Sequence, residues 1–187
     1  MKNKFYVMVL NCNESDLDLL NGFFSSIFGA SYNLKQYNDK VIIEHNYTDN
    51  KELVEAIRSF IFDTNLPIKV YVSDLVSDDI IEHSNIIYKY LLSSDANVYD
   101  DRSLIQNNIG SNMLDYKKII LKNYLFDSEM EWVILSFLKN NMNILKTSKD
   151  LFMHRNTLIN KLDKFMEKTG YDLRCFEDAY IIYTLIK

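Results

Sequence analysis

The sequence predicts an α+β domain followed by an all-α domain, and three observations lead to this prediction. In the first half, short runs rich in β-branched residues alternate with longer segments of helical periodicity. Around residues 93–111 the composition shifts to Ser, Asp and Asn. Beyond this stretch, every apolar pattern is helical. We therefore expect an α+β domain at residues 1–93, a connector with a basic helix at 94–126 and a helical domain at 127–187.

The first domain is expected to follow the order strand, helix, strand, strand, helix, strand, helix. Asn38-Asp39 suits a tight hairpin between the second and third strands, because both residues tolerate positive φ. The expected segments are Phe5–Leu10, a helix from Asn13 or Ser15 to Gly29, Tyr32–Tyr37, Lys40–His45, a helix opening at Thr48 or Asp49, Ile68–Ser73 and a helix from Ser77-Asp78-Asp79 to Leu92. This order is typical of a ferredoxin-like arrangement, with helices on one face of an antiparallel sheet.

The second half is expected to hold five helices. The first carries three lysines, and it is either a solvated helix or a second contact to phosphate. These lysines are Lys117, Lys118 and Lys122. The expected helices are Leu114–Phe126, Ser128–Asn140, Leu145–Phe152, Arg155–Lys168 and Phe176–Lys187.

The composition is that of a folded protein. Of the 187 residues, 48% are hydrophobic and 25% are charged, which argues against disorder. No apolar run reaches the roughly 18 residues of a membrane-spanning helix, and the first one breaks at Asn11, too early for a signal peptide. Cys12 and Cys175 are far apart and are expected to be reduced. We expect a cytoplasmic protein with no membrane partner.

The residues from Asn143 to Leu162 have the pattern of a helix-turn-helix. Four leucines have the spacing that packs two short helices across each other: Leu145, Leu151, Leu158 and Leu162. The first turn of the second helix is polar, as expected for a helix that enters the major groove of DNA. The same pattern also fits an ordinary helical hairpin with a solvated polar face.

The polar residues of this segment are of types that read DNA. Arg bonds guanine edges through two hydrogen bonds, Asn does the same with adenine, and Thr contacts a thymine methyl or a phosphate. Thr and Ser in the preceding helix can offer amides and hydroxyls to phosphate. The predicted DNA-binding residues are Thr147, Ser148, His154, Arg155, Asn156, Thr157, Asn160, Lys161 and Lys164.

These residues resemble the C-terminal helix-turn-helix domain of the PucR/CdaR family of bacterial transcriptional regulators. The residues that carry the resemblance are Asn143, Thr147, Leu151, His154-Arg155-Asn156-Thr157-Leu158, Leu162, Thr169-Gly170-Tyr171-Asp172-Leu173 and Phe176-Glu177-Asp178. The resemblance covers residues 128–187 and implies a DNA-binding transcriptional regulator.

The chain departs from the family pattern at two places. Ser148 stands where the family usually has alanine, and Asn160-Lys161 replaces a tyrosine-arginine pair. Lysine lacks the planar, bidentate guanidinium of arginine, so we expect an altered base preference. His154 is expected to cap or pack at the helix start more readily than to contact a base. Since only His45 and His83 accompany it, we expect no zinc or other metal site and no cofactor.

The charge distribution bears on the expected partner. The chain has a net charge of −5, which is unusual for a nucleic-acid binder. Between Lys139 and Lys168, however, seven basic residues outnumber three acidic ones, which gives +4 locally. A basic face on an acidic protein steers DNA to that face. Because one helix-turn-helix makes few phosphate contacts, we expect a homodimer that reads two half-sites of double-stranded DNA.

The resemblance also implies a degenerate GGDEF-like N-terminal domain. The turn that would carry the Gly-Gly-acid-acid-Phe loop is Gln36–Val41, which lacks both glycines and the paired acids. We therefore expect no cyclase activity and no enzyme. Effector sensing, dimerisation or a protein partner remain open for this domain. The alternatives to a regulator are an interaction adaptor whose helix-turn-helix has lost specific DNA reading and, without visible catalytic residues, an enzyme acting on nucleotides.

Overall fold

The structure is a computed structural model that describes residues 5–37, 39–47, 49–73, 79–108 and 114–187. The chain divides into two compact units, Met1–Asn108 and Ile109–Lys187, and each is described by itself. The hairpin residue Asn38 and the cap residues Thr48 and Ser77-Asp78, named above, lie outside the described residues.

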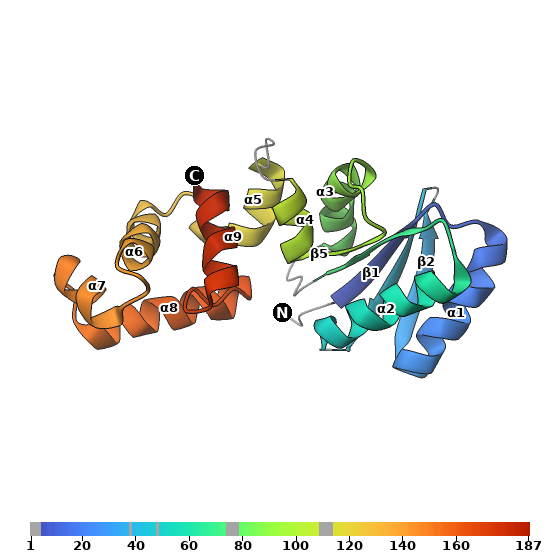
Figure 1. The fold of residues 1–187 in the computed structure, drawn as a ribbon, viewed down its shortest axis with the longest axis horizontal. Helices are drawn as coiled ribbons and strands as arrows, with labels where there is room; N and C mark the ends of the chain where they lie inside the picture. Colours follow the sequence, from blue (N-terminus) through green and yellow to red (C-terminus); the bar gives the residue numbers. More distant parts are fainter. Residues whose placement is uncertain (1–4, 38, 48, 74–78, 109–113) are drawn as a thin grey trace. The chain divides into compact units, whose positions relative to one another are not determined.

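The N-terminal unit is built on a five-stranded sheet (Figure 1). Its elements are β1 Phe5–Leu10, α1 Glu14–Phe28, β2 Tyr32–Tyr37, β3 Lys40–His45, α2 Asn50–Thr64, β4 Lys69–Val72, α3 Ile80–Leu92, β5 Val98–Asp100 and α4 Asp101–Asn107. The strand order is β2-β3-β1-β4-β5; the first four strands pair antiparallel and β5 pairs parallel to β4. The order of the first four strands confirms the ferredoxin-like prediction.

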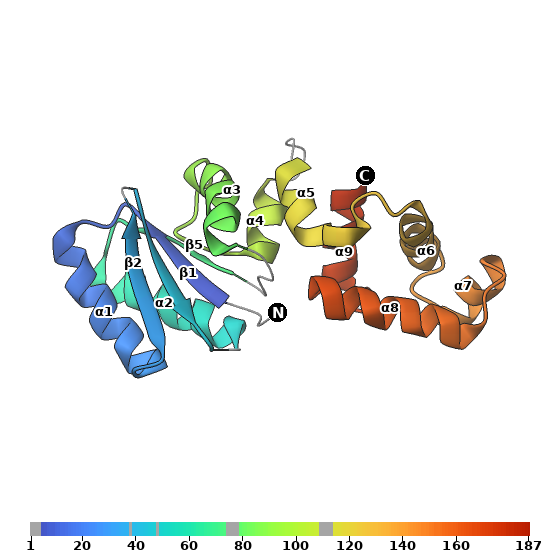
Figure 2. The ribbon, with the colours of Figure 1, turned by 180° about the vertical axis from the view of Figure 1, so that it is seen from behind.

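Helices cover both faces of this sheet, so the expectation of helices on one face is wrong. Val7 and Val9 of β1 pack into one core cluster with residues of α1 and α2. Their neighbour Tyr6 points to the opposite face, where its hydroxyl lies 2.6 Å from Nδ1 of His83 in α3. Figure 2 shows the strands in front of α1 and α2. The reason is β5, because a parallel strand needs a crossover connection, and α3 supplies it.

The segment expected as a connector contributes β5 and α4 to the N-terminal unit. Asp100 begins α4 with a capping box that it shares with Ser103. Tyr71 of β4 donates a hydrogen bond of 2.6 Å to the buried carboxylate of Asp101, which ties α4 to the sheet. The compact unit therefore extends to Asn108 rather than ending at Ser93.

The C-terminal unit is helical, as predicted. Its elements are α5 Leu114–Leu121, the 3-10 turn η1 Lys122–Tyr124, α6 Ser128–Lys139, α7 Ile144–Asp150, α8 Arg155–Thr169 and α9 Phe176–Ile186. Two lysines of the predicted basic helix make hydrogen bonds within the unit. Lys117 donates to the carbonyl of Ile186, and Lys122 donates to the carbonyl of Lys168. Lysines at these positions stabilise the carboxyl ends of two helices. None of the described helices combines the length and apolar composition needed to cross a membrane.

Candidate nucleic-acid interface

Two helices and a short turn form the candidate site. The first helix, α7, ends at Asp150, and α8 begins at Arg155, so residues 151–154 form the turn. The turn is closed by a hydrogen bond of 2.8 Å from the Met153 amide to the Ser148 carbonyl. This is the connection that the sequence pattern predicts for a helix-turn-helix.

The inner face of α8 fixes the helix against the rest of its unit. Leu158, Leu162, Phe165 and Thr169 recur at helical spacing, and all are buried. Gly170 ends the helix with φ 82°, a conformation that glycine adopts without a steric penalty. Helix α8 is therefore held along its whole length by burial on one side.

The outward face of α8 is polar and exposed. Asn156, Asn160 and Lys164 follow one another at intervals of four residues, opposite the buried face, and all three are exposed. Arg155 and Thr157 are exposed beside them in the first turn. Five of the predicted residues therefore lie together on the free surface of α8.

Thr147 and Ser148 do not lie where the prediction needs them. Both side chains are buried, Thr147 completely and Ser148 to all but 7%. The Ser148 hydroxyl donates to the carbonyl of Leu145, and the Thr147 amide donates to that of Asn143. Because α7 begins at Ile144, both residues lie past its first turn. The prediction that these hydroxyls and amides contact phosphate is wrong; the residues pack α7 against its neighbours instead.

His154 caps α8. Its Nδ1 accepts a hydrogen bond of 3.2 Å from the Asn156 amide, and its backbone has the extended conformation of an N-cap residue. This is the structural role expected for a histidine at a helix start. It orients the first turn that carries Arg155 and Asn156.

Lys161 differs from the other predicted residues. It is half-buried, and its Nζ lies 3.0 Å from the carboxylate of Glu129 in α6. This ion pair links α8 to α6 and turns the ammonium away from the outward face. The lysine that stands in the family's arginine position thus positions α8 in this structure.

Phe152 is a feature that sequence reasoning missed. Its side chain is 98% exposed, and its backbone is left-handed with φ 49°. Both properties are unfavourable for a bulky aromatic residue, and such outliers cluster at functional sites. The signal in the sequence was an aromatic residue within a turn. Phe152 lies three residues before Arg155, beside the exposed first turn of α8.

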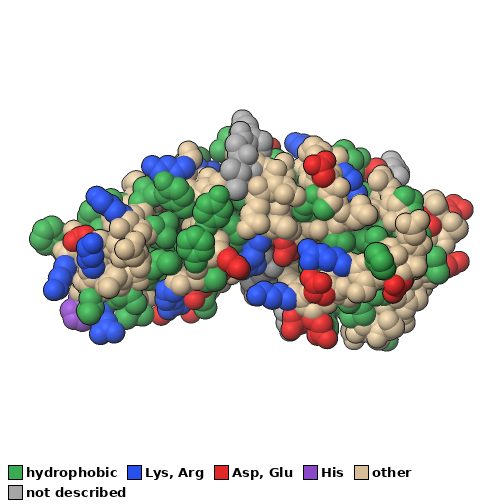
Figure 3. Space-filling model, viewed as in Figure 1, with side chains coloured by type: hydrophobic (Ala, Val, Ile, Leu, Met, Phe, Trp, Pro, Cys, Tyr) green, Lys and Arg blue, Asp and Glu red, His purple; other side chains and the backbone are tan. Residues whose placement is uncertain are grey.

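Exposed basic side chains lie on α7 and α8 (Figure 3, at the end of the molecule formed by these helices). The exposed ones are Lys146, Lys149, Arg155, Lys164 and Lys168. One of the nearby acids is neutralised, because Asp163 lies 2.8 Å from the guanidinium of Arg174. The local excess of positive charge therefore reaches the surface. Within the described ranges, no three His, Cys, Asp or Glu side chains come together as metal ligands would.

Comparison with known proteins places this site in a family. Residues 133–187 match the PucR C-terminal helix-turn-helix domain. The carbohydrate diacid regulator of Escherichia coli K12 is 39% identical over 54 residues, and the uncharacterized protein YxkF of Bacillus subtilis 168 is 39% identical over 57. The C-terminal unit thus carries a helix-turn-helix of the PucR type, which confirms the resemblance for this part of the chain.

The matched segment is a small part of these relatives. It covers 30% and 29% of this chain, and 19% of YxkF and 14% of the carbohydrate diacid regulator. Among solved structures, the regulator of polyketide synthase expression from Bifidobacterium adolescentis aligns over 98% of this chain and 78% of its own. Its sequence identity is 16% and the TM-score 0.46.

Proposed function

We propose that this chain, with its PucR-type helix-turn-helix, is a sequence-specific transcriptional regulator that inserts α8 into the major groove of double-stranded DNA. The observation that carries the proposal is the exposed stripe of Asn156, Asn160 and Lys164 opposite the buried face of α8. A helix that is fixed on one side and polar on the other is what groove reading requires.

Each exposed side chain of α8 is assigned a contact on DNA according to its chemistry. Arg155 matches the O6 and N7 acceptors of guanine, and Asn156 and Asn160 match the N6 and N7 edge of adenine. Thr157 contacts a thymine methyl or a phosphate. Lys164 contacts phosphate, which positions the helix without reading sequence.

The protein acts as a homodimer in this proposal. A single recognition module buries only about 600–1,000 Å² of protein surface on DNA, which limits affinity and specificity. Two copies that read half-sites about one helical turn apart supply both. The N-terminal unit then serves as a non-enzymatic regulatory part that receives an effector or a protein partner, and the protein works in the cytoplasm.

Two substitutions on α8 test the docking geometry. Arg155→Ala and Asn156→Ala are each expected to lower affinity for the selected site by about 10-fold or more, since one good base contact is worth about 1–3 kcal/mol. The site itself is obtained by selecting genomic fragments with the purified protein at a stated salt concentration. Asn33→Ala, at an exposed asparagine of β2 in the N-terminal unit, is the control. Unchanged binding of both α8 variants, with native circular dichroism, rules this geometry out.

The competing function is an interaction adaptor that no longer reads specific DNA. One observation favours it: Lys161, which stands in the place of the family's arginine, is engaged by Glu129. The adaptor predicts weak association that is equal for all sequences and disappears at modest salt. The regulator predicts enrichment of a two-fold-symmetric motif in the same selection.

A further inference from the structure

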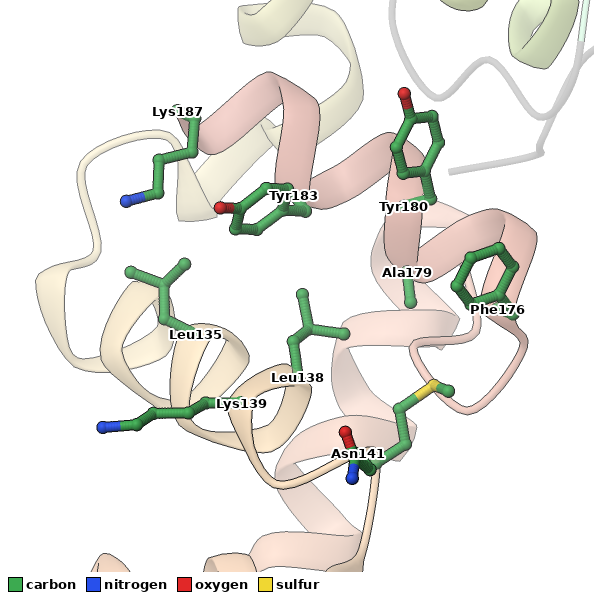
Figure 4. A pocket seen from close by; sticks show the side chains of 10 residues that line it. Leu135, Leu138, Lys139, Asn141, Phe176, Ala179, Tyr180, Tyr183 and Lys187 are labelled. Atoms are coloured by element: carbon green, nitrogen blue, oxygen red, sulfur yellow. The ribbon is translucent and has the colours of Figure 1, made fainter.

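An open apolar groove runs between α6 and α9 in the C-terminal unit. Its volume is about 590 Å³. Figure 4 shows Leu135 and Leu138 of α6 pointing toward Ala179 and Tyr183 of α9. This surface, together with Met142 and Tyr180, is called the α6–α9 groove. It contains no residue of α8, so it is separate from the proposed DNA-reading face.

The exposed face of α9 has the spacing of a helix-pairing seam. Phe176, Tyr180, Tyr183 and Lys187 recur at intervals of four, three and four residues, the alternation found in coiled coils. The three aromatic side chains are 71%, 45% and 41% exposed. Trp132 of α6 is 54% exposed as well. Figure 3 shows hydrophobic side chains gathered over α6 and α9. Large exposed apolar residues that gather in this way mark an interaction surface.

The charges at the two ends of the groove identify its partner. The amino groups of Lys139 and Lys187 lie at one end, and Phe176 lies at the other (Figure 4). Glu177 follows Phe176 in the first turn of α9 and is exposed. Glu177 and Lys187 are ten residues apart, which is about 15 Å along a helix, so they do not meet within one copy. A second α9 in the antiparallel direction brings each of them to the other.

We propose that the α6–α9 groove is the surface through which two copies of this chain pair, with the α9 helices antiparallel about a two-fold axis between Tyr180 and Tyr183. In this arrangement Glu177 faces the partner's Lys187, and Phe176 offers its ring to the same ammonium. A two-fold interface uses the same patch on both copies, and the seam is self-complementary in this sense. The inference deepens the dimeric part of the proposed function and rests on it for its biological purpose, but its test involves no DNA.

The size of the surface sets the expected strength. A stable interface takes about 20–30 residues from each side, whereas ten residues line the groove. We therefore expect reversible pairing with a dissociation constant on the order of micromolar. Binding to two half-sites on one DNA would strengthen it, because the second contact becomes intramolecular.

Sedimentation equilibrium of the full chain, without DNA, tests the proposal through exchanged charges. Glu177→Lys and Lys187→Glu are each expected to weaken pairing by about 10-fold, because each places like charges against each other. The double variant E177K/K187E restores pairing, since both contacts return with reversed sign. Only contact between two copies gives this rescue. Failure of the double variant to recover overturns the proposed antiparallel arrangement.

A substitution within the seam provides the second arm. Tyr183→Glu places a carboxylate in the apolar groove and is expected to abolish pairing, and Tyr183→Ser serves if the glutamate variant does not fold. Phe62→Glu, at a phenylalanine of α2 that is 86% exposed, is the matched control and leaves pairing unchanged. A wild-type chain that stays monomeric throughout the micromolar range overturns the proposal. The proposal is also overturned if the wild type is a monomer and replacement of Tyr183 makes that monomer expand in X-ray scattering. Such an expansion would mean that another part of the same chain, and not a second copy, covers the groove in the wild type.

Discussion

At the scale of single residues, Phe152 combines two unfavourable properties that a folded protein does not need. The ring is 98% exposed and the backbone has φ 49°. Phe152→Gly relieves the left-handed strain, so the free energy of unfolding is expected to rise by up to about 1 kcal/mol. If the ring contacts DNA beside Arg155, affinity falls by about 10-fold in the same variant. Urea unfolding and fluorescence anisotropy with the selected DNA site measure the two effects.

Two control variants separate the ring from the backbone. Phe152→Ala removes the ring and keeps the strained conformation, so it should lose DNA affinity without gaining stability. Phe62→Ala removes a similarly exposed phenylalanine from the N-terminal unit and should change neither affinity nor specificity. Full affinity of F152G and F152A for DNA means that Phe152 has no part in recognition.

His45 is the second residue with a measurable consequence. Burial lowers the pKa of His45 to about 4, and its ring stacks on Phe28 at 4.5 Å. The unfolded chain, with a histidine pKa of about 6.5, therefore binds the extra proton between pH 6.5 and pH 4. The contribution of the neutral His45 to the free energy of unfolding is fully present above pH 6.5. It is lost as the pH falls toward 4, and the loss is at most about 3 kcal/mol. His45→Phe should remove this loss.

The single tryptophan makes this test internally controlled. Trp132 lies in the C-terminal unit, so its fluorescence reports unfolding of that unit, whereas circular dichroism reports both units. The pH dependence assigned to His45 belongs to the circular-dichroism transition and not to the fluorescence transition. Equal acid sensitivity of the wild type and H45F shows that another group controls the acid response.

At the scale of elements, the sequence predicts those helices and strands whose ends and apolar spacing are visible within the segment itself. The expected helix Arg155–Lys168 agrees with α8 within one residue, because His154 and Gly170 mark its ends in the sequence. Strand β5 has three residues, too few to show periodicity, and only its pairing with β4 makes it a strand. The burial of Thr147 and Ser148 likewise depends on neighbouring helices, which no local pattern encodes. The exposed stripe of α8 was predictable because it is the complement of its apolar spacing.

Two glycines give opposite predictions for the same chemical change. Gly170 ends α8 with φ 82°, whereas Gly22 lies inside α1, and an added Cβ would meet nothing within 4 Å at either site. Gly170→Ala should therefore lower the free energy of unfolding by about 1 kcal/mol through backbone strain alone. Gly22→Ala should raise it by about 0.5–1 kcal/mol, because alanine is the better helix former.

The two glycine variants are read with two probes, one that follows the C-terminal unit and one that follows both units. Trp132 fluorescence follows G170A, and circular dichroism follows G22A, with the wild type in parallel urea titrations. A stabilising effect of G170A would contradict the left-handed end of α8. A destabilising effect of G22A would contradict the open space around Gly22 on α1.

At the scale of the whole molecule, the division into two compact units places the proposed DNA-reading helix in one unit and the five-stranded sheet in the other. Helix α8 and the α6–α9 groove both belong to the C-terminal unit. We therefore predict that residues 109–187, produced alone, bind the same DNA motif as the full chain. They should also self-associate within about threefold of the full chain's dissociation constant, well under the 1.4 kcal/mol of a tenfold change. Circular dichroism and Trp132 fluorescence establish that the fragment folds.

The outcome decides which unit carries dimerisation. A folded fragment that recognises the motif but remains monomeric, while the full chain pairs, assigns dimerisation to residues 1–108 and contradicts pairing through α9. A folded fragment that pairs but has lost the motif shows that the N-terminal unit contributes to DNA reading. If the fragment both pairs and reads, the sheet of the N-terminal unit is free to act as a regulatory part. An effector bound there would then change DNA affinity only by altering the equilibrium between states that differ in pairing or in the exposure of α8.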